Sequence, residues 1–179
     1  GKQGSEIDYS KMTKLAEPAE PFKCLIDPDD ERFINPPDMP AAIVGFCRET
    51  GQTPPASQGE FIRCCLESLA LKYRHGLDDI DRLTGAPVDV LHIVGGGTQN
   101  TLLNQFAANA CGRPVTAGPV EATAIGNILM QAVACGELES IAQGRELVKK
   151  SFPLQNYEPQ NTDAWEEQAR VLQKLVPTS

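Results

Sequence analysis

The fold is decided by the stretch VDVLHIVGGGTQN at residues 88–100. Its opening residues are nearly all β-branched or aliphatic, which is typical of a strand covered on both faces. Three consecutive glycines, Gly95–Gly97, then stop the strand. Thr98 or Asn100 has a side chain that can cap a following helix, which we expect to end near Cys111. The stretch therefore predicts a strand, a tight turn and a helix.

Downstream of this stretch, strands and helices continue to alternate. We expect a strand at residues 114–117, helices at 120–135, 138–150 and 163–175, and an extended, proline-interrupted segment at 151–160. Strands separated by helices imply parallel pairing. Two strands are too few for an independent α/β sheet, so further strands are expected from outside this set.

Upstream of the stretch, the sequence predicts helices and loops. A short helix is expected at residues 9–16, a loop at 22–40, and a helix that begins after Asp38. The longest helix is expected at 58–83, where apolar residues recur at three- and four-residue steps before Gly85 ends it. The fold class predicted from these patterns is a helix-rich α/β domain.

The composition excludes several classes of function. The chain has 41% hydrophobic and 22% charged residues, a net charge of −8 and a pI near 4.8. A nucleic-acid partner is not expected, because such binders normally carry a basic stripe. A membrane partner is not expected either, because no apolar run approaches the roughly 20 residues that span a bilayer. With no signal peptide visible after Gly1, the chain is expected in the cytoplasm.

The cysteines leave two interpretations open. There are six, at Cys24, Cys47, Cys64, Cys65, Cys111 and Cys135. None forms a CxxC pair and neither histidine lies at ligand spacing, so no metal site is expected. The interpretation that we favour is a set of small buried residues in a reducing cytosol. The other is one or two disulfides.

The glycine run is the first candidate binding site. Without Cβ atoms, Gly95–Gly97 allow the backbone to lie directly against a ligand. The helix that follows directs free N–H groups and its positive dipole end toward the same place. The run is not GxGxxG, because Asn100 occupies the third position, and no Gly-Lys-Ser/Thr follows as in a P-loop. A tight turn without any ligand is the alternative interpretation.

A second stretch, AGPVEATAIGNI at residues 117–128, is rich in small residues. Small side chains allow another helix or a backbone segment to approach closely. Glu121 lies near the helix start, where the dipole favours a carboxylate. No partner identifies Glu121 as a catalytic base, and a plain close-packed helix start is the alternative interpretation.

Several separated stretches together resemble the C-terminal domain of the FGGY carbohydrate kinases. They are LHIVGGGTQNTLLNQ (91–105), ACG (110–112), GPVEA (118–122), LIDPDD (25–30), RFINP (32–36), CRET (47–50) and ESLALKY (67–73). The resemblance covers about residues 9–157 and is most specific to the branch that phosphorylates L-rhamnulose. Long blocks in this order are far more specific than the glycine run alone.

The resemblance implies an actin-like, RNase-H-like ATPase fold in which two domains close over a cleft. The implied reaction converts ATP and L-rhamnulose into ADP and L-rhamnulose 1-phosphate, with Mg²⁺ on the phosphates. Gly95, Gly96 and Gly97 match the family's adenosine motif, and Gly96 is the residue expected to contact ATP. The stretch from Glu121 to Gln131 matches a connecting helix that helps to carry domain closure.

The resemblance also implies what this chain lacks. The family's catalytic base and first phosphate loop lie in the N-terminal domain, so no catalytic residue is assigned here. Residues 1–179 are expected to be the C-terminal nucleotide-binding domain, without its first strands and without the N-terminal domain, and to be inactive alone. The family can have cysteines at the positions of Cys47 and Cys64, which favours a disulfide between them. A non-catalytic interaction or sensing module, or a kinase for a related ketose, are the alternatives.

Overall fold

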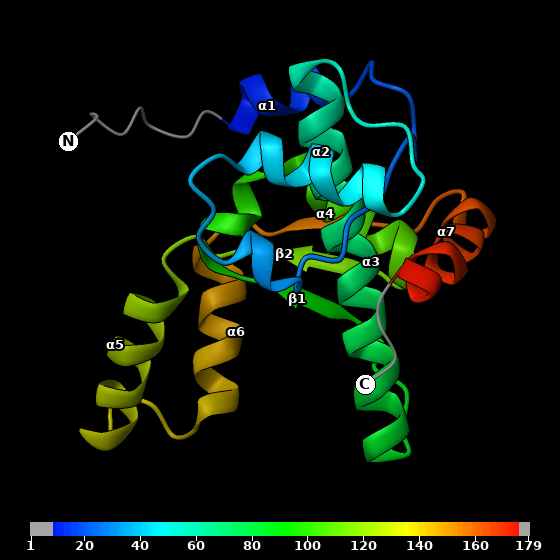
Figure 1. Ribbon diagram of the computed structural model, residues 1–179. Coiled ribbons are helices and arrows are strands. Elements are labelled where there is room, and N and C mark those ends of the chain that lie inside the picture. Colours follow the sequence, from blue (N-terminus) through cyan, green and yellow to red (C-terminus); the bar gives the residue numbers. More distant parts are fainter. Residues whose placement is uncertain (1–8, 176–179) are drawn as a thin grey trace.

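The computed structural model describes residues 9–175 and shows a small sheet with helices stacked against it (Figure 1). The helices are α1 (Tyr9–Ala16), α2 (Met39–Glu49), α3 (Gln58–Thr84), α4 (Thr101–Cys111), α5 (Ala122–Ala134), α6 (Ile141–Ser151) and α7 (Thr162–Leu175). Two 3₁₀ turns are η1 (Glu31–Phe33) and η2 (Gly95–Gln99), and the strands are β1 (Leu91–Ile93), β2 (Val115–Ala117) and β3 (Gln155–Tyr157). Within residues 9–175, no helix combines the length and apolar character needed to cross a membrane.

The helix boundaries agree closely with their sequence signals. The side chain of Asp38 accepts a hydrogen bond from Ala41 N–H and so caps α2 as predicted. The long helix is confirmed, and Gly85 ends it in a left-handed conformation (φ 70°) that a residue without a Cβ adopts at little cost. These signals are local in the chain, which explains why the sequence predicts them well.

The three strands lie in the order β1-β2-β3. As predicted, β1 and β2 are parallel, with Leu91 opposite Val115 and Ile93 opposite Ala117, and α4 connects them. The third strand pairs antiparallel with β2 and lies inside the segment expected only to be extended. Its polar sequence, Gln155–Tyr157, carries no hydrophobic alternation that would have identified it.

The prediction for the first strand was wrong in its length and in its cover. Only Leu91–Ile93 form β1, because the chain before them is held elsewhere: Val88 N–H donates to a carboxylate oxygen of Asp81 on α3. Leu91 and Ile93 pack toward α4, whereas His92 on the opposite face is exposed. Since side chains alternate along a strand, β1 has one covered face within the described residues.

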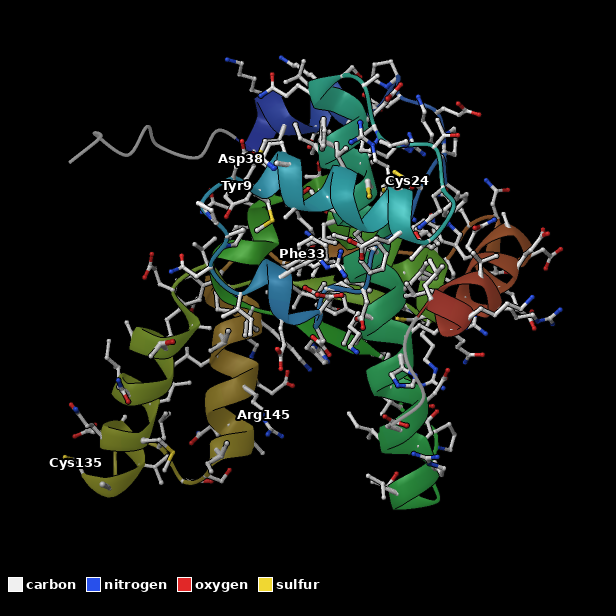
Figure 2. The ribbon with its side chains drawn as sticks, viewed as in Figure 1. Tyr9, Cys24, Phe33, Asp38, Cys135 and Arg145 are labelled. Carbon is white, nitrogen blue, oxygen red and sulfur yellow. The ribbon has the colours of Figure 1, made fainter. Side chains whose placement is uncertain are left out.

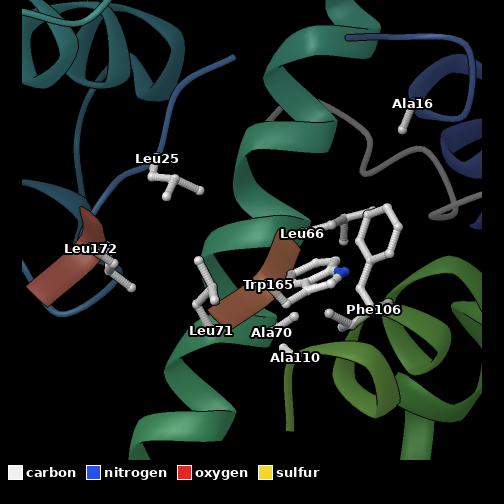
Figure 3. Close-up of a cluster of buried hydrophobic side chains, with 10 residues drawn as sticks. Ala16, Leu25, Leu66, Ala70, Leu71, Phe106, Ala110, Trp165 and Leu172 are labelled. Atoms are coloured by element: carbon white, nitrogen blue, oxygen red, sulfur yellow. The ribbon is translucent and has the colours of Figure 1, made fainter. Parts of the chain in front are cut away.

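The main hydrophobic core lies between α3, α4 and α7 (Figure 3). Trp165 of α7 occupies its centre, with its ring 5.2 Å from the Phe106 ring of α4 and 4.8 Å from the Phe22 ring. The remaining buried members of this core are Ala16, Leu25, Leu66, Ala70, Leu71, Leu103, Ala110 and Leu172. This core fixes α4, whose N-terminal end carries the glycine turn.

A buried carboxylate ties the first part of the chain to α3. Glu67, with 1% of its surface exposed, accepts hydrogen bonds from Phe22 N–H (2.9 Å) and from Arg63 Nε (2.7 Å). Arg63 also donates to the Glu17 carbonyl oxygen and lies over the Phe106 ring. Burial raises the pKa of the Glu67 carboxyl, and the neighbouring Arg63 opposes that shift.

Three of the six cysteines gather in a second buried cluster. Cys24, Cys47 and Cys64 pack with Ile43 and Phe46, between α2 and α3, and all are free thiols in this structure. Hydrogen bonds from Cys64 and Cys47 lower the pKa of Cys24, while burial raises that of Cys47 to about 12. Cys135, in contrast, is exposed at the far end of α5, remote from Cys24 (Figure 2). A Cys47–Cys64 bridge stays a prediction.

Candidate nucleotide site

The candidate site is the glycine turn η2, which connects the C-terminal end of β1 to α4. Gly95 has φ +77°, a conformation that other residues rarely adopt. Gly96 is exposed, and a Cβ placed on it would meet nothing within 4 Å. At Gly97 the nearest atom to an added Cβ would be Ile93 Cγ2, at 3.7 Å. The turn thus presents bare backbone to the outside at Gly96.

The structure brings the two sequence motifs together. Gly95 N–H donates to the Pro119 carbonyl oxygen (3.1 Å), and Gly118 N–H donates to the Ile93 carbonyl oxygen (2.9 Å). Both loops lie at the carboxyl ends of parallel strands, the edge where open α/β sheets bind their ligands. The glycine turn and the start of the second motif therefore form one continuous surface.

Three buried polar side chains support the glycine turn from behind. Thr98 Oγ1 donates to the Gly95 carbonyl oxygen (2.7 Å), closing the turn on itself. Asn100 is the helix cap, because its Oδ1 accepts from Leu103 N–H (3.0 Å). Asn104 Nδ2 donates to the Thr98 carbonyl oxygen (2.9 Å). Of the two caps considered from sequence, Asn100 is confirmed, and Thr98 braces the turn instead.

The role of Asn104 was not predicted from the sequence. It lies one turn into α4, and an asparagine inside a helix has no local signature of a contact with the preceding loop. Its spacing from Thr98 places it on the side of the helix that faces back over the turn, since helical side chains lean toward the N-terminus. That direction is the one signal that could have identified it.

Chemically, the turn is suited to an uncharged or anionic ligand held by backbone. Helix α4 begins one residue after the turn, so its positive dipole end lies beside the turn. Within residues 9–175, no group of three or more His, Cys, Asp or Glu side chains is arranged to hold a metal ion.

The second motif forms an apolar helical arm. Helix α5 has no charged residue and no buried residue, and with α6 it projects away from the sheet (Figure 1). Ile128 and Met130 are 64% and 54% exposed. The arm packs mainly on itself: a Cβ on Gly144 of α6 would lie 3.3 Å from Leu129 Cδ2. Glu121 is exposed and its carboxylate makes no capping hydrogen bond to α5.

Solved sugar kinases share this arrangement of strands and helices. Glycerol kinase of Plasmodium falciparum, solved with ADP, superposes with a TM-score of 0.65 over 96% of this chain and 35% of that one, at 15% identity. Xylulose kinase of Rhodospirillum rubrum gives a TM-score of 0.56 over 93% of this chain and 36% of that one, at 18% identity. The fold is therefore that of a sugar-kinase domain of the actin-like ATPase class, as predicted.

Sequence comparison defines the family. The FGGY family of carbohydrate kinases, C-terminal domain, matches residues 2–135, and the chain belongs to that family. Its relatives include the rhamnulokinases of Bacteroides thetaiotaomicron (48% identical over 90% of this chain), Pectobacterium carotovorum (46% over 85%) and Bacillus subtilis (39% over 90%). The chain spans about a third of their length: 33%, 31% and 34%, respectively.

Proposed function

We propose that this chain is the adenosine-binding part of an ATP-dependent sugar kinase that converts L-rhamnulose into L-rhamnulose 1-phosphate. The glycine turn is the main support for ATP binding. Its backbone is open at Gly96, and it follows the C-terminal end of β1. A side chain there would occupy the space that a flat base or a ribose needs. Membership of a carbohydrate-kinase family supports the same reaction class.

The choice of sugar rests on the relatives. Those at 39–48% identity are named rhamnulokinases, and the match extends along 85–90% of this chain rather than along the glycine turn alone. No residue described here is assigned to the sugar. The alternative is a kinase for a related ketose, and a panel of sugar substrates would distinguish the two.

The rest of the reaction requires groups beyond this chain. Phosphoryl transfer depends on positioning and on neutralising charge from both sides of the site, with Mg²⁺ bridging the phosphates. We assign the catalytic base and the sugar pocket to an N-terminal domain like that of the relatives, and we expect no turnover by this chain alone. That domain is also the proposed cover for the exposed apolar side chains of α5.

The proposed compartment is the cytoplasm. We take Cys24, Cys47 and Cys64, which gather in one buried cluster, to be reduced in the cell as they are in this structure, so that a Cys47–Cys64 disulfide would argue against this compartment. Free thiols close enough to interact persist where glutathione and thioredoxin keep them reduced. A kinase that uses ATP and a free sugar has both substrates in the same compartment.

A chimera tests this proposal. This chain replaces the matching third of the Bacteroides thetaiotaomicron rhamnulokinase, and phosphorylation is measured with L-rhamnulose and with a panel of other ketoses. We expect ATP-dependent formation of L-rhamnulose 1-phosphate by the chimera and none by this chain alone. A folded chimera without kinase activity on any sugar would favour the non-catalytic module. Preference for another ketose would correct the substrate.

A further inference from the structure

We propose that Asn104 is a positioning residue: from inside α4 it fixes the exit of the glycine turn and thereby sets the affinity of the proposed nucleotide site. The inference deepens the proposed function and rests on it. Asn104 itself lies behind the turn and is completely buried, so it acts through the backbone that it holds.

The hydrogen bonds of Asn104 give it this role. Its Nδ2 donates to the Thr98 carbonyl oxygen, and its backbone N–H donates to the Asn100 carbonyl oxygen (3.0 Å). Asn104 is therefore bonded to the turn through its side chain and belongs to α4 through its backbone. Within residues 9–175, Asn104 is the only side chain of α4 that donates a hydrogen bond to the Thr98 carbonyl oxygen. This amide therefore links α4 to the turn in addition to Asn100, which caps α4 and whose N–H donates to the Gly97 carbonyl oxygen (3.1 Å).

The oxygen atom of the Asn104 amide allows a positioning role to be distinguished from a structural role. Asn104 Oδ1 is buried and has no hydrogen-bond partner. Among the described residues, it is the only buried side-chain nitrogen or oxygen atom without one. A buried acceptor without a donor costs stability, whereas the bond from Nδ2 contributes to it. Replacing the amide by an apolar group of the same shape removes the unpaired Oδ1 but leaves the Thr98 carbonyl oxygen without its donor. Because the two effects oppose each other, global stability should change little, and the cost should be confined to the turn.

The amide orientation follows from the same contact. If the two amide atoms were exchanged, an oxygen would face the Thr98 carbonyl oxygen, and the buried donor would lose its partner. The arrangement with Nδ2 toward Thr98 satisfies one more group. The side chain is thus a donor to the turn, which is the property that a leucine lacks and that the turn requires.

The test compares two leucine variants of the full 179-residue chain. Asn104→Leu keeps the branching of the side chain and removes the donor. Asn109→Leu is the matched control, because Asn109 is a buried asparagine of the same helix whose Oδ1 accepts from Gln160 N–H and from Gln105, away from the turn. Amide hydrogen exchange, thermal unfolding and ATP·Mg²⁺ titration are measured on each variant.

For Asn104→Leu we expect exchange at Gly95–Asn100 to become about tenfold faster, an unchanged unfolding midpoint, and ATP affinity about tenfold weaker. Asn109→Leu should show the reverse, with a lower midpoint and an unchanged turn. Unchanged exchange in the turn, or unchanged ATP affinity with a loosened turn, would overturn the inference. So would global unfolding of both Asn104→Leu and Asn104→Ala, since that result indicates a structural role.

The proposed function and the role of Asn104 can be refuted independently of each other. If the unmodified chain is folded and binds no ATP, the nucleotide assignment fails, whereas the exchange data still decide whether Asn104 holds the turn. If the unmodified chain binds ATP and Asn104→Leu binds it equally well, only the role of Asn104 is refuted.

Discussion

The α5–α6 arm and the rest of the described chain, here called the body, differ in where their apolar side chains lie. In the body, amphipathic helices bury one side, and buried polar groups such as Glu67 are almost fully paired within the chain. In the arm, α5 is apolar, uncharged and without a buried residue. The body buries its apolar side chains within the chain, whereas α5 exposes an apolar surface that would be buried only by contact with another structure. The glycine turn lies where these two regions meet.

We expect the greatest loss of stability from a change in the main hydrophobic core. Trp165→Ala should lower the free energy of unfolding by about 3–5 kcal/mol, because it removes the ring at the centre of the core and leaves a cavity beside Phe106 and Phe22. Ile128→Ala on the arm is the comparison and should change the free energy by less than about 0.5 kcal/mol. Urea denaturation followed by circular dichroism measures both. Similar losses for the two variants would mean that α5 is packed as tightly as α7.

A charge on α5 tests whether the arm is covered in the complete enzyme. Ile128→Glu should leave the melting temperature of this chain nearly unchanged, because the side chain is exposed. In the active chimera described above, the same change should lower kcat/KM at least about tenfold, since it would bury an unpaired charge against the covering domain. Ile128→Leu is the control that should keep activity. A fully active Ile128→Glu chimera would show that this part of α5 stays exposed.

The smallest expected effect concerns an ion pair at the edge of the body. Asp81 pairs with Arg113 and accepts from Val88 N–H, and the Arg113 hydrogen bond lowers the pKa of the Asp81 carboxyl. A lowered pKa contributes stability above the unfolded value of about 3.9, and that contribution is lost as the pH falls through the folded value. Asp81→Asn should therefore be slightly less stable than the unmodified chain at pH 7 and equal to it in strong acid. An equal difference at both pH values would contradict the ion pair's contribution.

The sequence predicts local structure well and long-range structure poorly. The α2 cap at Asp38 and the α3 end at Gly85 depend on neighbouring residues, and both are confirmed. Strand β1 was predicted too long because Asp81, from an earlier helix, holds the chain at Val88. Strand β3 was predicted only as an extended segment, because its pairing with β2 is decided far along the chain.

The candidate site shows the same division. The turn at Gly95–Gly97 was predictable, because a run of glycines after an aliphatic strand indicates a tight turn. Gly95 does adopt a positive φ. The contact of Pro119 with Gly95 depends on the parallel pairing of two strands, and no local pattern reveals it. Asn104 was missed because its importance lies in a bond back to Thr98.

Calorimetric titration of ATP·Mg²⁺ into this chain and into its Gly96→Val variant tests directly whether the nucleotide binds at the glycine turn. A Cβ at Gly96 would meet nothing within 4 Å, so we expect the variant to fold normally, which circular dichroism would show. We predict measurable ATP binding by the unmodified chain and at least about tenfold weaker binding by the folded variant. Equal affinity of the two, or a folded unmodified chain that binds no ATP, would contradict the placement of the nucleotide at the glycine turn.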